Sequence, residues 1–324
     1  MTSVSDERTP IAPGLDGAVG LDILLRLLDL QPIGTSRISI DSAHGPLDGL
    51  GDSDATVFIG PSQRQPHHRV FGGQVLAQSL MAAGKTLDLA PDAPPRPVHS
   101  LHAYFMRPGD DTEPIRFAVE RMRDGRSFST RRVHAIQKGR PILSMSASFQ
   151  EPADGIEHED PMPSVPGPEG IPGLSDALAD WDNPYGEHVR NRPVELRHIQ
   201  GNLVLPSAER ERTTHQDVWM RTVAPLPDDP LVHACVLAYA SDYSLLEPIM
   251  RAHGLGYADP RLRIASLDHA MWFHRPVRMD QWVLYDTESP SASGGRGLGL
   301  GRLYQDGRLV ATVAQEGMVR IKPD

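Results

Sequence analysis

Hydrophobic positions in the first half of the chain follow two different periods. Apolar residues recur at helical spacing over 21–31, which predicts an amphipathic helix, and Gly72-Gly73 begin a second helical pattern that runs to about Lys85. Residues 55–59 and 97–149 have the pattern of strands. Two dipeptides in the later segment, Asp124-Gly125 and Lys138-Gly139, are typical of hairpin turns.

The second half of the chain repeats this order of patterns. Strands are predicted at 194–199 and 217–223, followed by a helix from about Leu231 to Met250 and further strands from Arg263 onward. Residues 151–175 hold six Pro and four Gly, so they form the strongest candidate for a linker. Residues 1–20 and 41–54 are predicted to be an irregular arm and a loop.

The two halves are related by an internal repeat with an offset of 168 residues. Phe105, Arg107 and Pro108 match Phe273, Arg275 and Pro276, and Gly139-Arg140 matches Gly307-Arg308 at the same offset. We therefore expect two copies of one unit, in which a helix packs on an antiparallel sheet. The expected units are residues 1–150 and 192–324, joined by a Pro/Gly-rich linker at 151–191.

Three polar residues interrupt apolar patterns in the second copy only. Asp242 is the one charge on the apolar face of the predicted helix, Gln315 lies in the apolar stripe of the last strand, and Ser266 begins a strand. At the offset of 168, Ser266 and Gln315 correspond to Val98 and Ala147. Alignment of the two helices by their apolar pattern, at an offset of 160, places Asp242 opposite Ala82, so all three first-copy residues are small or apolar. Each polar residue alone has an ordinary structural explanation, but together they predict one polar site, since burying a polar group is costly unless it is paired or used.

Composition narrows the classes of function. Lys and Arg number 32 against 42 Asp and Glu, so the net charge is −10 and no excess of cations attracts nucleic acid. The single cysteine excludes an intramolecular disulfide, and the acidic N-terminus lacks the apolar core of a secretory signal. The apolar stretch 21–30 is too short to span a membrane. We expect a cytoplasmic protein.

Several short motifs are weak signals. Gly295–Gly301 resembles a phosphate loop but lacks its Gly-Lys-Ser/Thr ending and is read as a bent strand. The pairs His67/His68 and His269/His274 lack the spacing of metal ligands on a helix, so no metal site is predicted. Cys235 lies in the apolar stripe of the predicted helix, so no thiol nucleophile is predicted. No Gly-x-Ser-x-Gly elbow of a serine hydrolase is present in the sequence.

Seven segments closely resemble the acyl-CoA thioesterase II family. They are RVFGGQVLAQSL (69–80), VHSLHAYFMRPGD (98–110), RDGRSFSTRRVHAIQKG (123–139), SMSASFQEP (144–152), LAYASDY (237–243), SLDHAMWFHRP (266–276) and VAQEGMVR (313–320). The resemblance implies an α+β double hotdog, two fused units that each wrap an antiparallel sheet around a long helix. The family more often has threonine where this chain has Ser266, which keeps the hydroxyl but loses the methyl group that restricts its rotamer.

The resemblance also implies a reaction. Asp242, Ser266 and Gln315 would position the water that hydrolyses an acyl-CoA thioester to fatty acid and CoA. We expect medium- to long-chain acyl groups and no cofactor or metal. Two alternatives stay open: a non-catalytic acyl-CoA- or lipid-binding protein, and an enoyl-CoA hydratase. The family also implies a homo-oligomer, either dimer or tetramer.

The phosphates of CoA require a local group of cations. The candidates from the sequence are five arginines: Arg121, Arg123, Arg126, Arg131 and Arg132. A solvated sheet face explains them equally well.

Overall fold

The computed structural model describes residues 18–38, 53–87, 93–178, 184–204 and 210–322. The expected arm at 1–20 and the loop at 41–54 lie almost entirely outside these described residues. The described chain forms two halves of similar composition, each with one long buried helix and one set of antiparallel strands.

The first half has two helices and six strands, in the order α1 (Ala18–Leu28), β1 (Gln31–Ile38), β2 (Ser53–Gly60), α2 (Gly72–Gly84), β3 (Val98–Phe105), β4 (Ile115–Asp124), β5 (Phe128–Gln137) and β6 (Arg140–Gln150). A connecting segment follows, with the short helices α3 (Leu174–Ala177) and α4 (Pro184–Arg190). The second half comprises β7 (Val194–His198), β8 (His215–Thr222), α5 (Pro230–Ser241), α6 (Glu247–Ala252), β9 (Leu262–Ser266), β10 (Asp268–Phe273), β11 (Val283–Ser293), β12 (Arg296–Gln305) and β13 (Arg308–Ile321).

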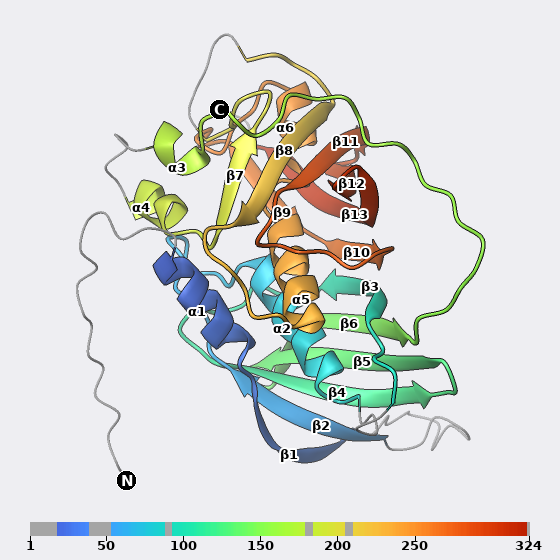
Figure 1. The fold of residues 1–324 in the computed structure, drawn as a ribbon. Coiled ribbons are helices and arrows are strands. Elements are labelled where there is room, and N and C mark those ends of the chain that lie inside the picture. The colour runs from blue at the N-terminus through green and yellow to red at the C-terminus, as the bar shows by residue number, and fades with distance from the viewer. Residues whose placement is uncertain (1–17, 39–52, 88–92, 179–183, 205–209, 323–324) are drawn as a thin grey trace.

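All the strands belong to one antiparallel sheet that runs through both halves. Its order is β1-β2-β4-β5-β6-β3-β10-β13-β12-β11-β8-β7, with β9 paired to β13. The halves join where β3 pairs with β10, for example Leu101 opposite Met271. The helices α2 and α5 lie side by side at the centre of the molecule, against this sheet (Figure 1). Their shared apolar surface forms most of the core.

The repeat predicted from the sequence is confirmed by the strand positions. Strands β4, β5 and β6 begin 168 residues before β11, β12 and β13. Both final hairpins turn through two residues of positive φ, Lys138-Gly139 and Asp306-Gly307, as a type I′ turn requires. Gln137 and Gln305 also correspond, and each donates its side-chain amide to backbone carbonyls of the matching connection, between β3 and β4 or between β10 and β11.

The prediction of one continuous helix at 231–250 is wrong. Helix α5 ends at Ser241, a turn covers 242–246, and α6 begins at Glu247. Pro248 explains the break, because it has no N–H to donate to Ser244 and its ring would collide with that carbonyl. As a result Asp242 lies at the C-terminal end of α5, where backbone and side chain are both fixed, rather than within a helix.

Two other expectations need correction. The first helix ends at Leu28 instead of residue 31, and the next residues form strand β1, which the irregular sequence around Gly34 conceals. In β13, the period-two alternation of the sequence predicts one apolar stripe from Leu309 onward. The ladder shifts register near Leu309, so Leu309 lies on the opposite face to Ala311, Val313 and Gln315.

The segment after β6 runs along the outside of the second half (Figure 1). Met162, Val165 and Ile171 pack against a small apolar cluster on the outer sheet face, and Trp219 Nε1 donates to the Pro166 carbonyl at 2.8 Å. Glu159 accepts from the backbone N–H of Leu309. The expected linker is therefore attached to the sheet over much of its length.

Candidate active site

The three polar residues singled out from the repeat come together in the structure. The side-chain amide Nε2 of Gln315 donates to Asp242 Oδ1 at 2.7 Å, and the Ser266 hydroxyl donates to the same oxygen at 3.4 Å. Each residue comes from a different element: Asp242 ends α5, Ser266 ends β9, and Gln315 lies within β13. The serine contact is long for a hydroxyl donor, so Gln315 makes the stronger bond.

The Asp242 carboxylate is almost fully buried from solvent. Its side chain is only 4% exposed. Burial raises the pKa of Asp242 from its usual value near 3.8 to about 6, although hydrogen bonds from Gln315, the Gly73 N–H and Ser266 act in the opposite direction. A carboxylate with this pKa is charged at neutral pH and still basic enough to accept a proton from water.

His269 is a neighbour of Asp242 that the sequence analysis did not assign to the site. Its Nδ1 lies 4.0 Å from Asp242 Oδ1, and burial lowers its pKa to about 3, so the imidazole is neutral and the contact is not an ion pair. Ser241 donates to the Ala238 carbonyl and therefore accepts from His269 Nε2 at 2.9 Å. The same repeat offset pairs His269 with Leu101, so this signal was present in the sequence.

The N-terminus of α2 meets the end of α5 at this site. The backbone N–H of Gly73 donates to the Asp242 carboxylate. A Cβ atom on Gly72 would lie 2.6 Å from Asp242 Oδ2 and 3.1 Å from the ring of Phe105, so glycine is required there. Amide groups in the first turn of a helix have no partner within the helix and can donate to an anion.

A cavity of about 650 Å³ opens beside Asp242. Its walls come from both halves and are largely apolar, with contributions from Val70, Phe71, Val75, Phe105, Ile142, Leu143, Leu246 and Ile264. Phe71, Tyr239 and Tyr243 form a compact aromatic group beside the carboxylate, with ring centroids 5.0–5.5 Å apart. Such a cavity suits an apolar chain that ends in a polar reacting group.

The five arginines suggested by the sequence are not among the cavity-lining residues. Arg131 is buried and structural, since its guanidinium donates to Asp124 at 2.7 Å and to Thr86 at 2.8 Å. Arg121 donates to the Thr56 hydroxyl on the neighbouring strand. The cations that do line the cavity are Arg69, Arg107 and Arg192.

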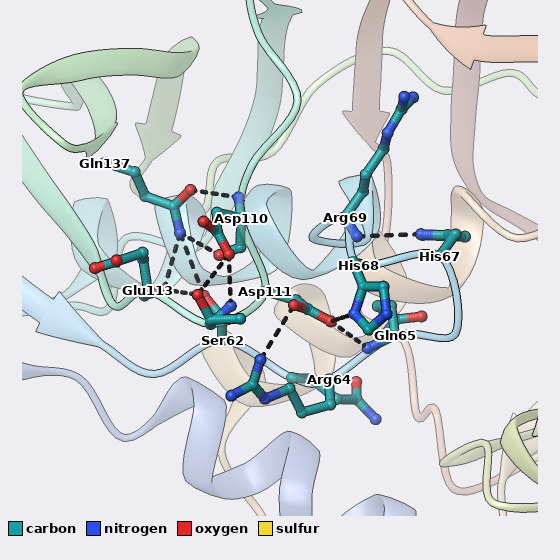
Figure 2. Close-up of polar contacts among 12 residues, drawn as sticks. Ser62, Arg64, Gln65, His67, His68, Arg69, Asp110, Asp111, Glu113 and Gln137 are labelled. Carbon is teal, nitrogen blue, oxygen red and sulfur yellow. Dashed lines mark hydrogen bonds and ion pairs between the residues drawn. The ribbon is translucent and has the colours of Figure 1, made fainter.

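The loop 61–70 forms one side of the cavity and is fixed by a buried carboxylate. Asp111 Oδ2 accepts from the Gln65 N–H at 2.8 Å and lies 3.9 Å from His68 Nδ1, and Oδ1 accepts from Arg64 Nη1 at 3.4 Å (Figure 2). The Val70 N–H donates to the Gly109 carbonyl. These contacts hold the loop against the segment that follows β3.

Family models match both halves of the chain. The model described as acyl-CoA thioesterase N-terminal domain matches residues 61–150, and the model described as acyl-CoA thioesterase matches residues 200–318. Acyl-CoA thioesterase 2 of Haemophilus influenzae is 39% identical over 273 residues, which are 82% of this chain and 93% of that protein. The chain belongs to the acyl-CoA thioesterase family.

Solved structures agree with this membership and with the predicted fold. The acyl-CoA thioesterase II TesB2 from Mycobacterium marinum matches with a TM-score of 0.70 and 39% identity, over 92% of this chain and 98% of that one. A hot dog fold protein from Alicyclobacillus acidocaldarius matches at a TM-score of 0.68 and 18% identity, over 93% of this chain and 98% of that one, which shows the fold alone. The expected α+β double hotdog is confirmed.

Within the ranges that the structure describes, no helix has both the length and the apolar character needed to cross a membrane. No group of three or more His, Cys, Asp or Glu in the same ranges is arranged to hold a metal ion.

Proposed function

We propose that this protein hydrolyses acyl-CoA thioesters to a fatty acid and CoA, using a water molecule activated by Asp242. The observation that carries the proposal is a single one: a buried carboxylate of raised pKa, held by Gln315 and Ser266, in the wall of a largely apolar cavity. Family membership supports the same reaction. The roles of the three residues rest on their geometry and chemistry.

Gln315 has the groups needed to orient the water. Its Nε2 donates to Asp242, while its Oε1 is buried and has no partner within the described part of the chain. A water that donates one hydrogen to the Asp242 carboxylate and the other to Gln315 Oε1 directs a lone pair away from both. Ser266, which lines the cavity, supplies a third polar contact.

The water oxygen attacks the thioester carbonyl carbon as its proton passes to Asp242. The negative charge then developing on the carbonyl oxygen is stabilised by an amide N–H at the N-terminus of α2 other than that of Gly73, which Asp242 already accepts. One such donor contributes about 3 kcal/mol in known oxyanion holes. Collapse of the tetrahedral intermediate breaks the C–S bond. Asp242 returns its proton to the departing thiolate, so the residue ends the cycle charged and no covalent enzyme intermediate forms.

The Asp242→Asn variant tests the role of the base. General base catalysis contributes about 10²- to 10⁴-fold, so the variant should lose at least about 100-fold in kcat in an assay of thiol release from acyl-CoA esters. Thr312→Val on the opposite face of β13 is the matched control and should keep the wild-type rate. If Asp242→Asn turns over the esters at the wild-type rate, the assignment is wrong.

The same assay separates the alternatives. A non-catalytic binding protein would bind acyl-CoA and release no thiol, and an enoyl-CoA hydratase would consume enoyl-CoA while the thioester stays intact. We propose medium- to long-chain acyl groups because the cavity is large and its walls are mostly apolar. Rates across an acyl series from four to sixteen carbons test this proposal.

Domain organisation, assembly and location are proposals of the same kind. We propose units at 1–150 and 192–324 with a linker at 151–191.

Exposed Tyr104 and Trp272 on adjoining strands β3 and β10 support a homo-oligomer, which light scattering tests. The lone buried cysteine supports a cytoplasmic location, which fractionation of the source cells tests.

A further inference from the structure

The charged residues around the cavity are distributed unlike those of the whole chain. The net charge of the chain is −10, yet within the described residues Asp242 is the one carboxylate that lines the cavity. Three arginines and two histidines line it as well: Arg69, Arg107, Arg192, His67 and His188. A local excess of cations in a protein of negative net charge indicates that this cavity attracts an anionic ligand.

Four of these residues form one group. His188 is close enough to Arg192 and His67 that both lower its pKa, which burial and these neighbours bring to about 4. His67 lies next to Arg69 in the loop, where the Arg69 N–H donates to His67 Nδ1 at 3.3 Å (Figure 2). The group therefore joins the loop before α2 to the region of α4.

This group lies beside the reaction centre. The Arg192 guanidinium stands 4.6 Å from the centroid of the Tyr243 ring, and Tyr243 follows Asp242 directly in the chain. Phe71, one residue before the N-terminus of α2, stacks on the same Tyr243 ring with centroids 5.0 Å apart. A ligand that reaches from Asp242 past these rings meets the cationic group.

The arginines of the loop side are available to an anion. Within the described residues, no carboxylate pairs with the guanidinium of Arg69 or of Arg107. In Figure 2 the Arg69 side chain points away from Asp111. The buried carboxylate therefore fixes the backbone of the loop but does not pair with the Arg69 guanidinium. By contrast, the buried Arg131 of β5 is paired with Asp124.

We infer that Arg69 and Arg192, with His67 and His188, form the site that binds the phosphate groups of CoA. The inference rests on the proposed function, because it assigns the non-reacting part of the thioester substrate. Arginine binds phosphate through two parallel charge-assisted hydrogen bonds, and a histidine N–H adds a further donor. The acyl chain then occupies the apolar part of the cavity, and the thioester lies between the two at Asp242.

The test compares two thioesters that differ in their phosphates. Decanoyl-CoA carries them, whereas S-decanoyl-pantetheine has the same acyl chain and reacting group without any phosphate. Arg69→Gln should raise KM for decanoyl-CoA about tenfold with little change in kcat, since it removes binding that is equal in ground and transition states. The loss should be confined to the phosphate-bearing ester, so the ratio of kcat/KM values for the two esters falls about tenfold.

Arg192→Gln is the second variant, from the other side of the group, and should also lose activity on decanoyl-CoA only. Arg121→Gln on the outer sheet is the matched control and should leave the ratio unchanged. Raising the salt concentration should weaken decanoyl-CoA binding by wild type more than by Arg69→Gln. The inference is overturned if both variants lose equally on the two esters, or if neither variant changes the ratio.

A binding measurement keeps the two proposals distinguishable. If wild type releases thiol from neither ester, the proposed function fails, but calorimetry with CoA, 3′-dephospho-CoA and pantetheine still decides the phosphate site. CoA should bind wild type about tenfold more tightly than Arg69→Gln, while pantetheine binds both alike. Equal affinity of the two proteins for CoA would overturn the inference whatever the hydrolysis assay gives.

Discussion

The pKa of Asp242 sets the pH range in which the proposed reaction can run. The base must be charged, so kcat/KM should fall about tenfold per pH unit below about 6 and level off above it. Gln315 donates a hydrogen bond that lowers this pKa, and removing it as Gln315→Leu should move the falling limb to higher pH as well as lower the plateau. Rates measured from pH 4.5 to 8.5 check both. A limb that stays in place in Gln315→Leu would contradict the hydrogen bond's role.

The burial of the Asp242 carboxylate should also lower the stability of the folded protein. Folding raises the pKa of Asp242 from near 3.8 to about 6, so the folded protein binds this proton more tightly than the unfolded chain. The contribution of Asp242 to stability is therefore best below pH 3.8 and declines as pH rises through 6, by on the order of 3 kcal/mol.

The neutral variant Asp242→Asn tests this cost, because its side chain does not titrate. Relative to wild type, its unfolding free energy should improve between pH 4 and pH 7.5, even while its activity is lost. Urea unfolding at the two pH values measures the difference. A constant difference, or one that shrinks toward pH 7.5, would show that Asp242 is not desolvated as the structure indicates.

Gly72 gives a steric test of the contact between the halves. The Cβ of Gly72→Ala would lie 2.6 Å from Asp242 Oδ2, so the carboxylate or the start of α2 must move. Displacements of about 1 Å at a reacting group cost about 100-fold in rate, and we expect a loss of that size in kcat/KM. Gly155→Ala, where an added Cβ meets nothing within 4 Å, is the matched control.

At the scale of elements, α6 holds the turn that carries Asp242. Glu247 and Arg251 of α6 are buried and bond to opposite ends of the same amide: Gln216 of β8 donates to Glu247 at 2.6 Å and accepts from Arg251 Nε at 3.0 Å. Burial disfavours the charge on Glu247, but His198, Gln216 and Arg251 outweigh it and lower its pKa. A network of this kind is sensitive to the loss of one member.

Glu247→Gln should therefore cost about 3 kcal/mol of unfolding free energy, because it leaves the buried guanidinium without a compensating charge. Exposed Glu187 on α4 provides the control Glu187→Gln, for which we expect less than about 0.5 kcal/mol. Guanidinium chloride unfolding measures both. Equal midpoints for the two variants would mean that α6 is held by apolar packing alone.

The elements that the sequence predicts best are those with a regular spacing of apolar residues and a matching element in the other half. The offset of 168 residues aligns three strands of one half with three of the other, and it singled out Ser266 and Gln315. The same comparison could have found His269 opposite Leu101. It could not place Arg192 near Tyr243 or His188 near His67, because those pairs are made by the path of the connecting segment, which has no period.

A local chemical rule overrode the helical pattern at one decisive position. The apolar stripe of 231–250 is real, but Pro248 breaks the helix and sets Asp242 at its end. The turn after the break packs closely against the glycines of β12, since a Cβ on Gly299 would lie 2.2 Å from the Leu245 carbonyl. The irregular turn and the glycine-rich strand therefore form one packed feature, although each was read separately from the sequence.

At the scale of the molecule, neither half contains the whole of the proposed site. The first half supplies Gly72, Gly73 and the loop cations, and the second supplies Asp242, Ser266 and Gln315. The halves also share the core between α2 and α5 and the ladder between β3 and β10. The units proposed from the repeat are thus structural copies whose folding we expect to be mutually dependent.

Cleaving the connection between the halves tests this dependence. Ile156 is 99% exposed in the segment after β6, so a protease site inserted there can be cut without disturbing a buried contact. The two pieces should stay together, because the shared core and the β3–β10 ladder do not pass through the cut, and thioesterase activity should persist. After separation in urea, neither piece alone should hydrolyse decanoyl-CoA, and mixing them on dilution should restore activity. If the piece from 157 onward were active by itself, the α2 N-terminus of the first half would have no place in the reaction.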